Sequence, residues 1–237
     1  GWLRFVGEAA QRVAEDYLRI LRFFRFTAWY ADPERGMDEA GLAACAAHAA
    51  GLRGISAERI TVELKKLLSA PDPAPAVEAM AGAGVLKAIL PGAETGALAP
   101  LVALEQAEGR APDPVLRLAA LGGPDPTARL RLSKAEARRL AALRASVHED
   151  LRPGALGYRM GAEDGMGAVL LHSAETGRPL PPDAAQAVAQ GAEAVFPVRA
   201  EDLMPDYSGP ALGARLKALE ERWIASGFTL GREALLA

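Results

Sequence analysis

Hydrophobic and polar positions recur with a helical period near the start of the chain, over residues 8–30. When successive residues are placed about 100° apart, as on an α-helix, two sets separate. The apolar set, which predicts a face buried in a core, comprises Val13, Tyr17, Ile20, Leu21 and Phe24. The charged set lies on the opposite side and comprises Arg12, Glu15, Asp16, Arg19 and Arg22. The pattern therefore predicts one amphipathic helix with a charged outer face.

Similar patterns and helix-start signals continue to the end of the chain. Four Asp-Pro pairs, beginning at residues 32, 72, 113 and 125, each offer a capping carboxylate followed by a proline suited to the first helical position. The predicted helices cover residues 8–30, 37–49, 56–70, 73–83, 84–90, 98–109, 113–121, 133–150, 161–176, 183–193, 199–204 and 210–226. Ala, Leu, Glu and Arg dominate the composition, whereas Ile and Thr are sparse, which favours helices over sheets. We therefore expect an all-α fold with almost no strand.

The composition excludes several classes of protein. The 237 residues suffice for one large domain or for two to three small ones, and a single cysteine cannot form an intramolecular disulfide. Cys45 and His48 are at most an incomplete pair of metal ligands, and we interpret them as small core residues at a helix interface, so no metal site is predicted. No apolar run is long enough to span a bilayer, and we expect no membrane partner and a cytoplasmic location.

The charged face of the first predicted helix carries the most informative chemistry. A carboxylate accepts hydrogen bonds and a guanidinium donates them in a planar fork, so Asp16 and Arg19, one turn apart, can together match the edge of a nucleobase. The alternative is a solvated face with an ion pair that contributes a few tenths of a kcal/mol. Spacing alone leaves both interpretations open.

The residues around this pair carry a family resemblance. Arg4-Phe5-Val6-Gly7, then Arg12 and the run Glu-Asp-x-x-Arg-x-x-Arg from Glu15 to Arg22, closely resemble the neck of class II tRNA nucleotidyltransferases and bacterial poly(A) polymerases. The resemblance implies that Asp16 and Arg19 hydrogen-bond the base of incoming CTP or ATP. Glu15 and Arg22 would then be supporting members of a nucleotide-binding site.

A second segment, Gly54-Ile55-Ser56-Ala57-Glu58-Arg59-Ile60 followed by Glu63-Leu64, resembles an element that braces the neck helices in the same family. Ser56 is suited to cap a helix here, and Arg59 and Glu63 are spaced as an i,i+4 pair. We interpret these two residues as structural support. The resemblance continues weakly through residues 202–204 and 209–223.

The family's catalytic head carries an Asp-x-Asp pair that holds two magnesium ions, and this chain contains no Asp-x-Asp. The only Gly-Gly pair, Gly122-Gly123, runs into Pro124-Asp125-Pro126, which is typical of a turn and a helix start. We therefore predict that this chain is a neck, body and tail fragment without catalytic residues or a cofactor of its own. In the full-length enzyme, Mg²⁺ would be bound by the chain's N-terminal head.

Basic residues are concentrated in one segment although the net charge of the chain is −3. Six cations fall within residues 129–144 against the single acid Glu136. A capping box formed by Ser133 and Glu136 predicts a helix start, with Lys134, Arg138 and Arg139 near its exposed side. A weaker candidate lies at the start of the 210–226 helix, where Arg215 and Lys217 follow the helix N-terminus. These five cations either contact RNA phosphates or belong to ordinary solvated faces.

Together these features predict an elongated, multi-helical array. Residues 1–70 would form the neck, residues 71–150 a helical body beyond a hinge at 71–75, and residues 151–237 a tRNA-binding tail that opens with the break at 152–154. The predicted function is the nucleotide-selecting and tRNA-binding part of an enzyme that adds CCA to tRNA 3′ ends, with tRNA or another RNA 3′ end, CTP and ATP as partners. The alternatives are a poly(A) polymerase, an enzyme adding part of CCA, or a noncatalytic RNA-binding module. The oligomeric state is not indicated.

Overall fold

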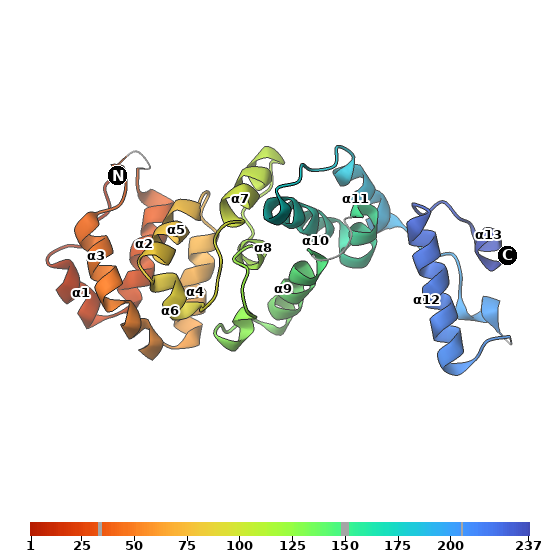
Figure 1. Ribbon diagram of the computed structural model, residues 1–237, viewed down its shortest axis with the longest axis horizontal. Helices are drawn as coiled ribbons and strands as arrows, with labels where there is room; N and C mark the ends of the chain where they lie inside the picture. The colour runs from red at the N-terminus through yellow and green to blue at the C-terminus, as the bar shows by residue number, and fades with distance from the viewer. Residues whose placement is uncertain (33–34, 148–151, 205) are drawn as a thin grey trace. The chain divides into compact units, whose positions relative to one another are not determined.

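The computed structural model describes residues 1–32, 35–147, 152–204 and 206–237, and within them it contains helices and no strand (Figure 1). The all-α prediction is confirmed. The chain divides into two compact units, the first formed by residues 1–148 with 170–178 and the second by residues 149–169 with 179–237. The boundaries between neck, body and tail at residues 70 and 150 stay predictions. No helix in the described ranges is both long and apolar enough to cross a membrane.

The first unit is a cluster of short helices. Their bounds are α1 Ala9–Glu15, α2 Leu18–Tyr30, α3 Glu39–His48, η2 Ala49–Gly54, α4 Ala57–Leu68, α5 Ala74–Gly82, α6 Val85–Ile89, α7 Leu98–Ala107, α8 Pro114–Ala119, η3 Pro126–Ala128 and α9 Lys134–Ser146. Helix α2 packs against α4 and α5, so the apolar face predicted for residues 8–30 lies in the core. Val13, Ile20, Leu21 and Phe24 are buried and Tyr17 is half-buried.

The predicted continuous helix over residues 8–30 is wrong, because the chain breaks between α1 and α2. Asp16 has an extended backbone, with φ −154° and ψ 104°, and follows the last residue of α1. Its carboxylate accepts a hydrogen bond from the backbone N–H of Leu18 at 3.1 Å. Short polar side chains compete with the helix for backbone hydrogen bonds in this way and favour helix starts. The break turns Asp16 into a cap for α2.

Local capping signals account for other helix starts. Asp113 accepts hydrogen bonds from the first turn of α8, Asp125 does so for η3, and Asp72 accepts one from the backbone N–H of Ala74. Ser133 and Glu136 form the predicted capping box of α9. The turn predicted at Gly122-Gly123 is confirmed, since both residues have positive φ angles. The start predicted at Asp32-Pro33 falls partly outside the described residues.

The segment predicted as a hinge is held at its start by a buried arginine. Arg117, on α8, donates hydrogen bonds to the backbone carbonyls of Leu68, Ala70 and Pro71. Its Nε atom donates to Glu105 on α7. One guanidinium therefore ties the end of α4 to both α7 and α8, and the hinge at 71–75 stays a prediction.

The second unit has its own core. It contains the first part of α10, whose full bounds are Pro153–Thr176, with α11 Ala184–Glu193, η4 Ala200–Leu203, α12 Gly209–Ala225 and α13 Arg232–Leu236. Trp223 on α12 packs on Tyr158 and Phe228, with ring centroids 5.4 Å and 5.0 Å away. The residue pattern predicts no helix at α13, because five residues are too few for a helical period to show.

Gly154, which was interpreted as part of a break, belongs to the packing between α10 and α11, together with Gly157 and Gly191. Helix α10 begins at Pro153 rather than near residue 161, and the nonhelical residue inside it is Gly161. A Cβ atom on Gly157 would lie 2.0 Å from the carbonyl oxygen of Val188, and one on Gly191 would lie 1.9 Å from that of Gly154. The glycines are needed because the two backbones nearly touch.

Candidate functional site

A pocket of about 290 Å³ lies in the first unit, between the N-terminal segment and helices α1 and α2. Its lining residues are Leu3, Arg4, Phe5, Val6, Arg12, Arg19, Arg22, Phe23 and Phe26. Four of these nine residues are arginines, three are phenylalanines and none is acidic. Guanidinium groups bind phosphate and carboxylate oxygens, and aromatic rings stack on flat ligands. The lining is therefore suited to an anionic ligand that carries a flat ring.

Arg19 is held in this lining by bonds to α1. Its Nη1 atom donates to the carboxylate of Glu15 at 2.6 Å and to the backbone carbonyl of Arg12 at 2.8 Å. Arg12 donates to the same carboxylate oxygen of Glu15 at 2.5 Å. The hydrogen bond from Arg19, with further help from Arg12, lowers the pKa of the Glu15 carboxyl below its ordinary value. Glu15 thus remains charged and orients two of the four pocket arginines.

Asp16 faces a different partner from Arg19. Its carboxylate lies 3.3 Å from an Nη atom of Arg59 on α4, while it also caps α2. Asp16 and Arg19 do not share one continuous helix face, and the ion pair between them that was the alternative interpretation is not formed, since each side chain has another partner. Asp16 is not among the pocket-lining residues and sits beside them at the α1–α2 junction.

Glu63 lies close to one of the pocket arginines, Arg22. Its carboxylate is only 6% exposed and lies 2.8 Å from Nε of Arg25 and 3.5 Å from Nε of Arg22. The i,i+4 pair expected between Arg59 and Glu63 is wrong, because α4 packs alongside α2 and each residue reaches across to that side of the fold instead. Both residues nevertheless connect α4 to the segment that carries the candidate site.

Several lining residues had no role assigned from the sequence. Arg4, Phe5, Phe23 and Phe26 line the pocket together with Arg19 and Arg22. The rings of Phe5 and Phe23 are stacked, with centroids 5.3 Å apart and an interplanar angle of 12°. Arg4 and Phe5 belong to the Arg-Phe-Val-Gly motif, so a signal was present. The helical period placed Phe24 on the core face and gave no role to Phe23 or Phe26, and no sequence rule brings residues 4 and 22 together.

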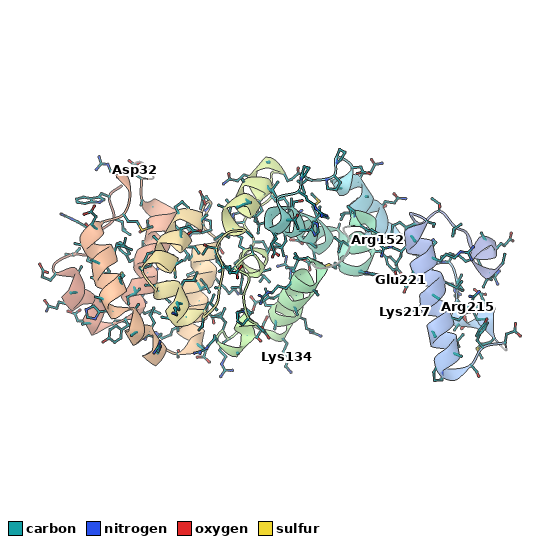
Figure 2. All side chains as sticks on the ribbon, viewed as in Figure 1. Asp32, Lys134, Arg152, Arg215, Lys217 and Glu221 are labelled. Atoms are coloured by element: carbon teal, nitrogen blue, oxygen red, sulfur yellow. The ribbon has the colours of Figure 1, made fainter. Side chains whose placement is uncertain are left out.

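The basic segment divides into structural and exposed cations. Arg139, expected near the exposed side of α9, is half-buried and binds both carboxylate oxygens of Asp113. Burial raises the pKa of Asp113, but the bonds from Arg139 and from the start of α8 outweigh it, and the pKa lies below its ordinary value. Arg144 donates to the backbone carbonyls of Gly123 and Pro124. Lys134 and Arg138 are exposed, and Figure 2 labels Lys134 at the edge of α9.

In the second unit, Arg215 and Lys217 both lie on α12 (Figure 2). The guanidinium of Arg215 lies over the ring of Tyr207, 5.9 Å from its centroid. Lys217 is exposed and lines a shallow groove of about 510 Å³ together with Phe196 and Glu220. The two cations therefore have different surroundings, and nothing in their geometry makes them one site.

The comparison with protein families supports a relationship over part of the chain. Residues 36–96 match the family described as the probable RNA and SrmB-binding site of polymerase A. The chain is 58% identical over 66 residues to the human mitochondrial CCA tRNA nucleotidyltransferase 1, a match that covers 28% of this chain and 15% of the relative. It is 41% identical over 85 residues to the CCA-adding enzyme of Streptococcus sanguinis, covering 36% of this chain and 21% of that protein.

Solved structures extend the likeness in fold to nearly the whole chain. The CCA-adding enzyme of Bacillus stearothermophilus in complex with CTP aligns with a TM-score of 0.69 and 24% identity, over 94% of this chain and 60% of that one. The Thermotoga maritima CCA-adding enzyme complexed with tRNA aligns with a TM-score of 0.59 and 16% identity. That alignment covers 96% of this chain and 61% of the solved one. At these identities the likeness shows the fold. The chain spans about three fifths of each solved enzyme.

Proposed function

We propose, on the premise that this chain is a relative of the class II tRNA nucleotidyltransferases, that it is the nucleotide-selecting and tRNA-binding part of an enzyme that adds CCA to tRNA 3′ ends. The observation that carries the proposal is the pocket lined by Arg4, Arg12, Arg19 and Arg22 together with three phenylalanines and no acid. A nucleoside triphosphate combines a flat base with several negative charges, and this lining complements both features.

In this proposal, Arg19 and Asp16 choose the base. Arg19 donates hydrogen bonds from the pocket wall, and Asp16 at the α1–α2 junction supplies the acceptor. Each now binds a protein partner, Glu15 and Arg59 respectively, so a base would compete with a partly exposed ion pair. Such pairs are weak at the surface, where water screens the charges, so a bound base can replace them with little loss of stability. Arg22 and Glu15 support the pair.

The catalytic step would take place outside this chain. In the family reaction the RNA 3′-hydroxyl attacks the α-phosphate of CTP or ATP and displaces pyrophosphate, and bound magnesium ions would stabilise the charge on the phosphates. In the described residues no three acidic, histidine or cysteine side chains gather into a metal site, so the residues present here do not fit those ions. We propose that the N-terminal head supplies the metal site, that this chain alone transfers no nucleotide, and that the enzyme acts in the cytoplasm.

Two measurements test the proposal on the enzyme that contains this chain. Arg19→Ala should abolish most of the preference for CTP and ATP over GTP and UTP, while the thermal unfolding midpoint changes little. Arg138→Ala, which removes an exposed cation of α9, is the matched control. An unchanged nucleotide preference in Arg19→Ala would reject the assignment.

The second candidate function is that of a poly(A) polymerase. The neck motif is shared with those enzymes, and the description of the matched family names polymerase A. Incubation of the enzyme with tRNA that lacks its 3′ terminus, and with CTP or ATP alone, separates the two activities. Incorporation of CTP supports CCA addition or partial CCA addition, whereas long products from ATP alone indicate a poly(A) polymerase.

A further inference from the structure

An exposed strip of aromatic and basic side chains runs along α2 and α4, starting at the rim of the arginine-lined pocket. We call it the α2/α4 strip, and its members are Arg22, Phe26, Trp29, Tyr30, Val62 and Lys66. Arg22 and Phe26 also line the pocket. Trp29 is 41%, Tyr30 64% and Val62 50% exposed. Apolar side chains of this size that lie together on a surface mark a binding face more often than single ones do.

The contacts show that the strip is continuous. The ring of Tyr30 lies 6.0 Å from that of Phe26 and 6.4 Å from that of Trp29. The indole N–H of Trp29 donates to the backbone carbonyl of Lys66 at 2.8 Å, which fixes the indole ring at the junction of α2 and α4. Val62 and Lys66 are one turn apart and share a face of α4. The aromatic side chains therefore join the pocket rim to α4.

The charges of the strip favour a polyanion. Arg22 and Lys66 carry positive charge at its surface. The acid closest to Arg22, Glu63, is buried and is shared with Arg25. Beyond Tyr30, Asp32 is paired with Arg35. Exposed rings interleaved with cations are the features that bind single-stranded nucleic acid, since bases stack on the rings and phosphates contact the cations.

We infer that the α2/α4 strip binds the unpaired 3′ end of an RNA, with a base stacked on Trp29 or Tyr30 and a phosphate near Lys66. The seven-residue step from Arg22 to Trp29 spans about 10 Å of helix, which is longer than one base is wide. The strip therefore extends past a nucleotide held in the pocket and can hold the strand that receives it. This inference rests on the proposed function, because it identifies the strand as the acceptor of the selected nucleotide.

The test is a binding titration of this chain with a short fluorescently labelled single-stranded RNA that has the sequence of a tRNA 3′ end. Trp29→Ala should weaken RNA affinity about fivefold or more, and Tyr30→Ala should weaken it in the same direction. Trp29→Phe keeps a ring and should retain most of the affinity. Lys66→Ala should lower the slope of log affinity against log salt by about one. Val195→Ala, at an apolar residue that is 81% exposed in the second unit, is the control and should bind like the unmodified chain.

A parallel titration with CTP separates the strip from the pocket, since Trp29→Ala should leave CTP affinity unchanged. Tyr30→Ala keeps the inference testable if Trp29→Ala fails to fold, because Tyr30 is the most exposed of the three rings. RNA binding that is unchanged in both Trp29→Ala and Tyr30→Ala would overturn the inference alone and indicate a protein-contact face. If Trp29→Ala does not fold, unchanged binding in Tyr30→Ala together with an unchanged salt slope in Lys66→Ala would overturn it. If the unmodified chain binds no RNA, the inference and the tRNA-binding part of the proposed function both fail.

Discussion

The Nε atom of Arg117 donates a hydrogen bond to the carboxylate of Glu105 at 2.7 Å, and both side chains are only 1% exposed. Burial raises the pKa of Glu105 above its ordinary value, although the bond from Arg117 opposes that effect. The same guanidinium donates to the carbonyls of Leu68 and Pro71 at 2.8 Å and 3.4 Å. The pair thus lies where α4, α7 and α8 meet.

Removing this guanidinium should destabilise the fold strongly. Arg117→Met leaves the Glu105 carboxylate buried without its partner and leaves backbone carbonyls unpaired, so the free energy of unfolding should fall by about 3–5 kcal/mol. Urea unfolding followed by circular dichroism measures the change. Arg131→Ala, which removes an exposed partner of Glu58, should lower the free energy of unfolding far less, because water screens an exposed ion pair. Equal losses in the two variants would show that burial does not decide the energy of the Arg117 pair.

Replacements at Asp16 should separate its capping role from nucleotide selection. Asp16→Asn keeps an oxygen that can accept the Leu18 N–H but loses the negative charge, so stability should change by less than about 0.5 kcal/mol. Asp16→Ala removes the cap and should cost about 1 kcal/mol. Both variants should lose nucleotide preference in the enzyme. Normal preference in Asp16→Asn would show that its charge does not contribute to nucleotide selection.

The ion pair between Lys65 and Glu136 predicts a defined dependence of stability on pH. The hydrogen bond from Lys65, with a second from the backbone N–H of Ser133, lowers the pKa of Glu136 to about 2 from an ordinary value of 4.5. A lowered pKa in the folded state stabilises the fold above about pH 4.5, and the stabilisation is lost as the pH falls towards 2. Glu136→Gln should therefore be less stable than the unmodified chain at pH 6, and the difference should vanish near pH 2.

Acid titration of the two proteins, monitored as the urea midpoint at each pH, measures this difference. Glu108→Gln, at an exposed position after α7, should show no comparable trend. A difference between Glu136→Gln and the unmodified chain that stays constant from pH 6 to pH 2 would contradict the assigned ion pair.

Close packing of α10 on α11 should make one glycine replacement harmful and another helpful. Gly191→Ala places a methyl group 1.9 Å from the carbonyl oxygen of Gly154, so the helices must separate and stability should fall by about 1–3 kcal/mol. Gly213→Ala on α12 meets no atom within 4 Å and should add about 0.5–1 kcal/mol through helix propensity. Thermal unfolding of the two variants checks both signs, and equal shifts would contradict the packing argument.

The sequence predicted those parts of the fold that depend on neighbouring residues. The capping box at Ser133 and Glu136 and the start of α8 at Asp113-Pro114 are local, and the structure has both. The break at Asp16 was missed because the same residue fits a charged helix face and a helix cap, and only the fold decides between them. The start of α10 was predicted near residue 161 because Gly154 was interpreted as part of a break, whereas Gly154 and Gly157 both lie in the contact with α11.

The candidate site was predictable in part. Arg19 and Arg22 line the pocket as the resemblance suggested, although their roles stay predictions. The partners of Arg59 and Glu63 depend on α4 lying beside α2, and the i,i+4 spacing pointed to the wrong pair. Arg139 was assigned to a surface, but its partner Asp113 is 26 residues away in sequence.

The position of Asp16 at the junction between α1 and α2 has a consequence for how this region can vary among related proteins. One carboxylate starts a helix, binds Arg59 and stands beside the pocket, so a replacement that cannot accept the Leu18 N–H, such as alanine, would weaken the start of α2 while it changes the edge of the pocket. A replacement of that kind would call for a second change that restores the start of α2, whereas asparagine would not. Under the proposed function, nucleotide preference should therefore change more readily through replacements of Arg19, whose backbone lies within α2 and does not begin it.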